Sequence, residues 1–76
     1  MMGKLTKARR KVLAVIPDWT APYEVVERLS LTMTQHPAIV RRLDDLVSEG
    51  LAYFSPANRT YRASFTGRAA LEDGSR

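Results

Sequence analysis

The 76-residue sequence contains no cysteine and a single histidine, His36. Disulfide frameworks need paired cysteines, and structural zinc sites need several Cys or His ligands, so the sequence excludes both. A domain this small buries only about 60% of the surface that its unfolded chain exposes. We therefore expect one domain with a thin core, for which a second copy of the chain is the remaining common source of buried area.

Long hydrophobic runs are also lacking. The apolar stretch that follows the basic N-terminus covers only Val12 to Ile16. A bilayer span needs about 20 apolar residues, and a signal-peptide core is also longer than this stretch. We expect an intracellular, cytoplasmic protein with no membrane partner.

A catalytic constellation is missing as well. The sequence has no Gly-rich phosphate loop, and no base is evident for a Ser or Thr nucleophile. Asp44 and Asp45 are adjacent, so on a helix they diverge by about 100° and cannot work as an acid/base pair. His36 has no suitably spaced second ligand. The sequence therefore predicts no enzyme, no catalytic residue, no metal site and no cofactor.

Positive charge is present in excess and is unevenly placed. The net charge is +4, and residues 1–42 hold eight of the twelve Lys/Arg against three acids, which gives that segment +5. Residues 43–76 carry −1. A basic half on a small domain favours a polyanionic partner, most often nucleic acid, although a merely solvated basic surface is the plain alternative.

Helical periodicity accounts for the first two thirds of the chain. Apolar residues three and four apart predict a first helix from Thr6 to Ile16, ended by Pro17, and a second from Pro22 to about Leu29. The clearest helix runs from Pro37 to Glu49, after a polar connector at Thr32–Pro37. Its core stripe is Ile39, Leu43, Leu46 and Val47, and Gly50 ends it.

Extended patterns follow. Residues 51–55 and 60–63 predict two short strands around the turn at 56–59, and Ser64 is the expected N-cap of a last helix that reaches about residue 72. The predicted fold is mainly α with a small β-hairpin (α+β): a three-helix bundle, a two-stranded hairpin and a short C-terminal helix. The expected domain covers residues 5–72, with flexible tails at 1–4 and 73–76.

Three segments resemble a known family, and one of them, Glu24 to Leu31, resembles the first helix of that family's turn motif. Leu43-Asp44-Asp45-Leu46-Val47-Ser48-Glu49-Gly50-Leu51 resembles the end of a recognition helix entering the wing of a winged helix-turn-helix domain. Tyr61 to Arg68 is similar to the second wing strand and following helix of MarR- and PadR-like transcriptional regulators. The resemblance covers about residues 5–72 and implies duplex-DNA binding. One departure is the connector at 32–37, which is about three residues longer than the family's turn and carries Pro37.

The resemblance implies that the third helix reads base edges in the major groove. The candidate contacts there are Gln35, His36, Ala38, Arg41 and Arg42. Arg41 is the best placed, because it lies opposite the core stripe and can bond guanine bidentately. Its alternative is an ion pair with Asp44 or Asp45 along the helix.

Phosphate contacts are expected outside that helix. The candidates are Asn58, Arg59 and Arg62 on the wing, Lys7, Arg10 and Lys11 on the first helix, and Thr20 before the second. Plain solvation is the alternative for the wing and for the first helix. The aromatic residues favour core and hairpin packing over a stacking platform for single strands: Trp19, Tyr53, Phe54, Tyr61 and Phe65.

Two hypotheses of different classes follow. The first is sequence-specific binding of double-stranded DNA by a small transcriptional regulator or repressor, acting as a homodimer and without an evident small-molecule effector. The alternative is a winged helix used as a protein–protein interaction module within a larger assembly. Arg41 and Arg42 favour the first hypothesis, and Asp44 and Asp45 mildly favour the second.

Overall fold

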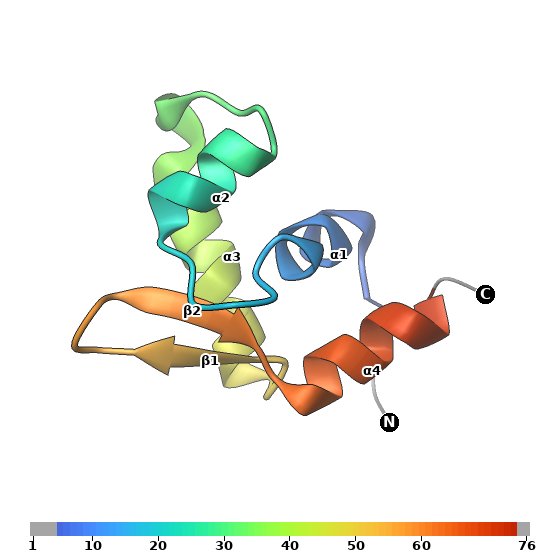
Figure 1. Cartoon of the computed structure of the whole chain (residues 1–76). Helices are drawn as coiled ribbons and strands as arrows, with labels where there is room; N and C mark the ends of the chain where they lie inside the picture. The colour runs from blue at the N-terminus through green and yellow to red at the C-terminus, as the bar shows by residue number, and fades with distance from the viewer. Residues whose placement is uncertain (1–4, 75–76) are drawn as a thin grey trace.

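The computed structural model describes residues 5–74. This part of the chain forms four α-helices, a 3₁₀ turn and one antiparallel hairpin (Figure 1). In chain order the elements are α1 (Lys7–Ala14), α2 (Pro22–Arg28), η1 (Met33–Gln35), α3 (His36–Ser48), β1 (Ala52–Ser55), β2 (Thr60–Ala63) and α4 (Phe65–Gly74). The expected small α+β fold is confirmed. Of the expected tails at 1–4 and 73–76, residues 1–4 and 75–76 lie outside the described residues. Residues 73 and 74 belong to α4, which reaches Gly74, so the expected domain end at residue 72 was two residues short.

Helix α1 begins after the predicted cap at Thr6 and ends two residues before the predicted end at Ile16. The Thr6 hydroxyl oxygen accepts a hydrogen bond from the backbone N–H of Arg9 at 3.2 Å. The helix stops at Ala14, three residues before Pro17, whose ring cannot continue a helix. Val12 and Leu13 are buried, and the first turn contains no acidic residue to offset its basic side chains.

The connector before α3 is more ordered than its polar composition predicts. After α2, the turn η1 runs directly into α3, which starts at His36, one residue before the expected position. Pro37 is accommodated in the first turn of α3, where its missing N–H is not needed. The longer connector therefore contains one 3₁₀ turn, η1, which directly precedes α3.

Helix α3 and the hairpin meet at Gly50. Ile39, Leu43 and Leu46 are buried along α3, as the stripe predicts. Gly50 follows the helix with φ of +78°, a left-handed conformation that glycine adopts without a steric penalty. The chain then reverses into β1 and returns as β2, with Ala52 paired to Ala63 and Phe54 to Tyr61.

A third segment lies beside the hairpin. Thr20 in the α1–α2 linker exchanges two backbone hydrogen bonds with Tyr61, at 2.9 and 2.8 Å. The linker thus pairs with β2 on the side away from β1. A two-stranded hairpin is marginal alone, and this added pairing fixes it to the helices.

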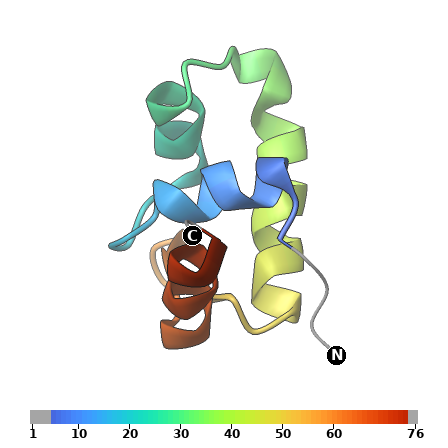
Figure 2. The same cartoon turned by 90° about the vertical axis from the view of Figure 1, so that its right-hand side faces the viewer.

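The core lies between the three N-terminal helices and the inner side of the hairpin, with α1 crossing in front of α3 in Figure 2. α4 closes it from below through Gly67, whose position leaves no room for a Cβ beside the backbone of Leu51. Ser64 caps α4 as expected, since its Oγ accepts from the Gly67 N–H at 3.0 Å. None of the helices in residues 5–74 combines the length and hydropathy needed to cross a membrane.

Candidate nucleic-acid interface

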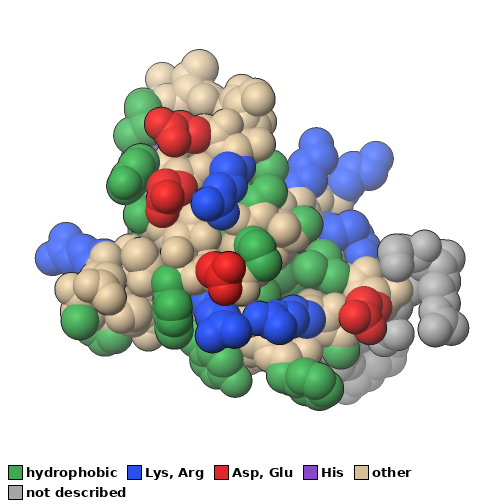
Figure 3. Space-filling view, viewed as in Figure 1, with side chains coloured by type: hydrophobic (Ala, Val, Ile, Leu, Met, Phe, Trp, Pro, Cys, Tyr) green, Lys and Arg blue, Asp and Glu red, His purple; other side chains and the backbone are tan. Residues whose placement is uncertain are grey.

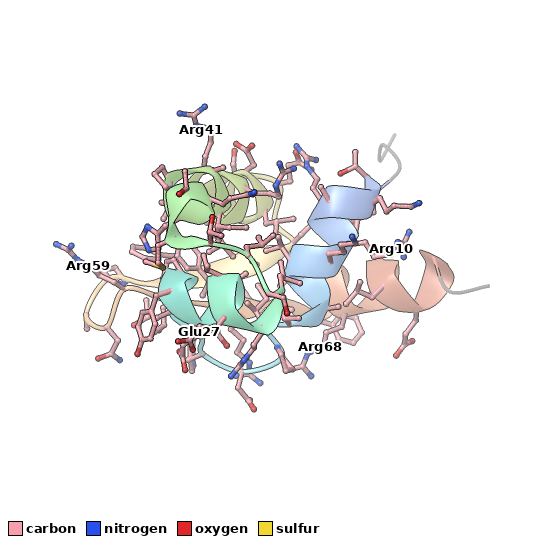
Figure 4. All side chains as sticks on the ribbon, turned by 90° about the horizontal axis from the view of Figure 1, so that it is seen from above. Arg10, Glu27, Arg41, Arg59 and Arg68 are labelled. Atoms are coloured by element: carbon pink, nitrogen blue, oxygen red, sulfur yellow. The ribbon has the colours of Figure 1, made fainter. Side chains whose placement is uncertain are left out.

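Arg41 projects from the outer side of α3. Its side chain is exposed and points away from the body of the molecule (Figure 4). The expected alternative was an ion pair with Asp44 or Asp45, but in the described part of the chain neither carboxylate pairs with Arg41. Its guanidinium group is therefore available to a ligand.

Asp44 is occupied by a different partner. Its Oδ1 accepts a hydrogen bond from the Tyr61 hydroxyl at 2.6 Å, which joins β2 to one flank of α3. Burial of the Tyr61 hydroxyl, together with this hydrogen bond and the negative charge of Asp44, raises its pKa to about 12. The Tyr61 ring also packs against Phe54, with the ring centroids 4.9 Å apart. The hydrogen bond therefore holds the hairpin against α3, and the ring contact joins the two strands of the hairpin.

The opposite flank of α3 is joined to α1. The Arg9 guanidinium forms an ion pair with the Glu49 carboxylate at 2.6 Å. Arg42 lies seven residues before Glu49, so the two are within about 20° of each other around the helix. Arg42 therefore lies on the α1 flank, whereas Arg41 lies between the two flanks.

The tip of the hairpin presents Asn58 and Arg59. Both side chains are exposed, and Arg59 has a left-handed backbone conformation with φ of +53°. Its N–H donates to the Ser55 carbonyl oxygen at 2.7 Å, which closes the turn. Figure 4 shows Arg59 pointing outward on the side of the molecule next to the one from which Arg41 projects.

A groove opens between α1, the end of α2 and the start of α3, with a volume of about 650 Å³. Five of the predicted contact residues line it: Lys7, Lys11, Gln35, Ala38 and Arg42. Arg28 also lines it, although the sequence analysis did not select this residue. A cation in the last turn of a helix is ordinarily explained by the helix dipole, so no sequence signal distinguishes Arg28.

His36 is half-buried at the start of α3 and does not line that groove. Arg10 is partly exposed on α1, on the side of the molecule opposite Arg59 (Figure 4). Arg62 pairs with Tyr53 across the hairpin, on the side facing away from the buried Tyr61 and Ala63. The fold therefore distributes the predicted cations over several sides of the molecule.

Thr20 requires a correction, because its side chain is 1% exposed. Its hydroxyl donates to the Asp18 carbonyl oxygen at 2.7 Å and accepts from Arg28 Nη1 at 3.2 Å. Its backbone amide is committed to Tyr61. Thr20 stabilises the linker and is not accessible to a phosphate.

The aromatic residues also depart from expectation. Tyr61 is buried, but Trp19, Tyr53 and Phe65 are 47%, 56% and 83% exposed, and Phe54 is exposed beside Tyr61. Ala52, Tyr61 and Ala63 occupy the buried positions of the hairpin, and strand alternation turns Tyr53 outward. Figure 3 shows hydrophobic side chains beside Lys and Arg over the hairpin and α4. The expected core and hairpin packing is therefore wrong for Trp19 and Phe65, whereas Tyr53 lies on the hairpin but on its exposed side.

No protein-family model matches the chain, and the comparisons with curated proteins and with solved structures return no match.

Proposed function

We propose that this chain is a winged helix-turn-helix domain that binds double-stranded DNA. In this proposal α3 enters the major groove and the β1–β2 hairpin is the wing. The observation that carries it is the exposed Arg41 guanidinium on the outer side of α3, which has no ion-pair partner within residues 5–74. An arginine in this position can form two hydrogen bonds to guanine in the major groove.

The contacts on the two flanks of α3 support this orientation. A helix in the major groove has a phosphate backbone on each side. On one flank, the Tyr61–Asp44 hydrogen bond holds the hairpin, whose tip presents Arg59. On the other flank, the Arg9–Glu49 pair holds α1, and here Lys7, Lys11 and Arg42 line the groove. The cations on the two flanks of α3 would therefore each face one of the two phosphate backbones of the DNA.

The acidic residues limit how α3 is seated. Asp44 and Asp45 are exposed in the second half of the helix and would repel phosphates. The N-terminal half, from His36 to Arg41, therefore enters the groove. This docking brings Gln35, at the end of η1, close to the base edges, where it is a candidate for a specific contact.

We propose a biological role as a small transcriptional regulator or repressor in the cytoplasm. Homodimers of DNA-binding domains read palindromic sites, with one half-site for each subunit. We propose that the exposed side chains of Trp19, Tyr53 and Phe65 form an aromatic surface that pairs with a second copy, because exposed apolar patches mark interaction sites.

Selection from a random duplex library tests the function, followed by fluorescence anisotropy on the recovered sequence. Arg41→Ala is expected to weaken binding by about 10- to 100-fold and to relax one base position. Arg68→Ala is the matched control, since it removes the same charge from the side of the molecule opposite Arg41 (Figure 4) and should weaken binding much less. Five phosphate contacts per subunit predict that the logarithm of the binding constant falls with the logarithm of the salt concentration with a slope of about −4.5. Absence of binding even at low salt would refute the proposal.

The same aromatic surface favours a second candidate, a protein–protein interaction module. In that case Trp19, Tyr53 and Phe65 would contact a different protein, and α3 would not enter DNA. The duplex-library selection separates the two functions. A DNA-binding domain recovers a sequence whose affinity Arg41→Ala lowers, whereas an interaction module recovers no sequence at all.

A further inference from the structure

The outer side of the hairpin faces away from α3. The Tyr61 side chain points inward, and its hydroxyl bonds to α3. Successive strand residues alternate between the two sides of a sheet, so Arg62 points outward together with Tyr53, its cross-strand partner. Thr20 pairs with Tyr61 and is buried like it, which turns Trp19 outward beside Arg62. Trp19, Arg62 and Tyr53 therefore form one row on the side of the hairpin away from α3.

The exposed side of α4 continues this row. Phe65 and Arg68 are three residues apart, so they lie on the same side of the helix. The Arg68 Nη2 donates at 3.3 Å to the carbonyl oxygen of Pro17, which lies shortly before Trp19 in the linker. Figure 4 shows Arg68 on the side of the molecule opposite Arg41. The aromatic surface and the outer side of α3 therefore face in opposite directions.

The aromatic surface also carries charges of both signs. Asp18 precedes Trp19 in the linker and is exposed, and Arg62 lies within the row. Neither Asp18 nor Arg62 has an ion-pair partner within residues 5–74. Each contact occurs twice in a two-fold dimer, so Asp18 of one copy opposite Arg62 of the other gives two ion pairs. The surface is therefore self-complementary, which favours a second copy over an unlike partner.

Pairing through this surface places the two α3 helices on opposite outer sides of the dimer. A palindromic site on one duplex needs both reading helices on the same side, about 34–36 Å apart. To reach both helices of this dimer, one duplex would have to turn back around it. DNA has a persistence length of about 150 base pairs and resists such a turn within a few tens of base pairs. The dimer therefore cannot seat both α3 helices on one short duplex.

We propose that the dimer bridges two separate DNA segments, with one α3 helix in the major groove of each. This inference rests on the proposed duplex binding and on the proposed pairing through the aromatic surface. The shortest extent of the chain is 19 Å, so two paired copies hold the segments apart by about twice that length. Because the Debye length is about 8 Å at physiological ionic strength, salt screens the repulsion between the two duplexes. Such a dimer joins two distant sites of one DNA into a loop or holds two DNA molecules together.

A co-capture assay with the full chain tests the bridging. Two duplexes of about 25 base pairs, too short to turn around the dimer, carry the sequence recovered from the library. One is labelled with biotin and the other with fluorescein. Streptavidin beads should retain the fluorescein-labelled duplex only when the protein is present. Retention should pass through a maximum as protein is added, because excess protein gives each duplex a dimer of its own.

Phe65→Gln distinguishes bridging from the reading of a palindrome. If each duplex contacts one subunit, a weakened dimer should lower the retained fluorescein at least about tenfold, while the Kd for a single duplex changes by less than about twofold. A dimer seated on one palindrome would instead lose affinity for that duplex. Tyr53→Gln is the second variant, used if circular dichroism shows Phe65→Gln to be unfolded. Tyr23→Gln, on α2, is the matched control and should leave retention and Kd unchanged.

The possible outcomes distinguish failure of the bridging from failure of the proposed function. Co-capture that Arg41→Ala abolishes and Phe65→Gln lowers supports the bridging. Duplex binding without co-capture, or by a chain that sedimentation equilibrium shows to be a monomer, overturns the bridging and leaves DNA binding standing. Co-capture that neither Phe65→Gln nor Tyr53→Gln lowers also overturns it, because the copies then pair elsewhere. Absence of binding to any duplex refutes the proposed function and the bridging with it.

Discussion

The Tyr61 hydroxyl donates a 2.6 Å hydrogen bond to the Asp44 carboxylate, linking the second hairpin strand to the longest helix. The same residue pairs through its backbone with Thr20 in the α1–α2 linker. Tyr61 thus joins the hairpin both to α3 and to the α1–α2 linker. The position of the hairpin relative to α3 depends on this residue more than on the turn sequence.

The first prediction concerns the ionisation of Tyr61. Its pKa is raised from 10.0 to about 12, first by burial and then by the hydrogen bond and charge of Asp44. The unfolded chain loses this proton near pH 10 while the folded chain keeps it, so the contribution to stability is complete below pH 10. It is lost as pH rises towards 12. Absorbance of phenolate should show one tyrosine ionising near pH 12.

Tyr61→Phe is the control for that prediction. It removes the late ionisation, and denaturant titrations should show the stability difference from the unmodified chain shrinking between pH 10 and 12. Asp44→Asn should lower the Tyr61 pKa without restoring 10.0, because burial remains. A Tyr61 that titrates near pH 10 in the folded protein would contradict the described geometry.

The second prediction concerns Gly67. A Cβ at this position would collide with the backbone of Leu51 and press on Leu13, so Gly67→Ala must displace α4. We expect a loss of about 1–3 kcal/mol in the free energy of unfolding, measured in urea. Gly50→Ala is an informative comparison: nothing lies near its Cβ, so only its left-handed backbone contributes, at about 1 kcal/mol. Equal losses with an unmoved α4 would be inconsistent with the packing at Gly67.

The third prediction separates stability from binding at the hairpin tip. Arg59 has φ of +53°, a conformation that costs a non-glycine residue about 1–2 kcal/mol. Arg59→Gly relieves this strain and loosens the unfolded chain, so we expect stability to change by less than about 1 kcal/mol. DNA affinity should nevertheless fall, with a salt slope lower by about 1. Arg59→Lys, which keeps the charge, should retain most of the affinity.

The fourth prediction concerns self-association. Phe65 is 83% exposed, so Phe65→Gln should change monomer stability by no more than about 0.5 kcal/mol. If a second copy covers the aromatic surface, sedimentation equilibrium should show the dimer weakened. Tyr23→Gln removes another exposed aromatic, from α2, and should leave the dimer intact. The dimer proposal for this surface fails if Phe65→Gln associates as strongly as the unmodified chain.

Local sequence signals predicted most of the fold. The caps at Thr6 and Ser64 and the glycine after α3 act within one helical turn, and all are present. Such signals do not depend on distant residues. Such local signals can therefore be recognised in a single sequence.

The candidate site was less accessible to sequence reasoning. The groove is lined by side chains from three helices, and Arg28 enters it only because the end of α2 packs beside α1. Thr20 was chosen as an accessible hydroxyl, but its pairing with Tyr61 depends on residues far along the chain. Trp19 and Phe65 are large apolar residues of the kind usually buried, yet in residues 5–74 both side chains are exposed, one in the α1–α2 linker and one at the start of α4.

The pairing of Thr20 with Tyr61 has a consequence for how the chain folds. The hairpin cannot acquire its final support until a segment from the first third of the sequence has closed a long loop onto it. Contacts at such separation cost entropy before they stabilise anything, and they tie distant segments into one cooperative transition. A fragment that ends before β2, or one that begins after the linker, should therefore fail to fold, so that the domain assembles as a whole or not at all.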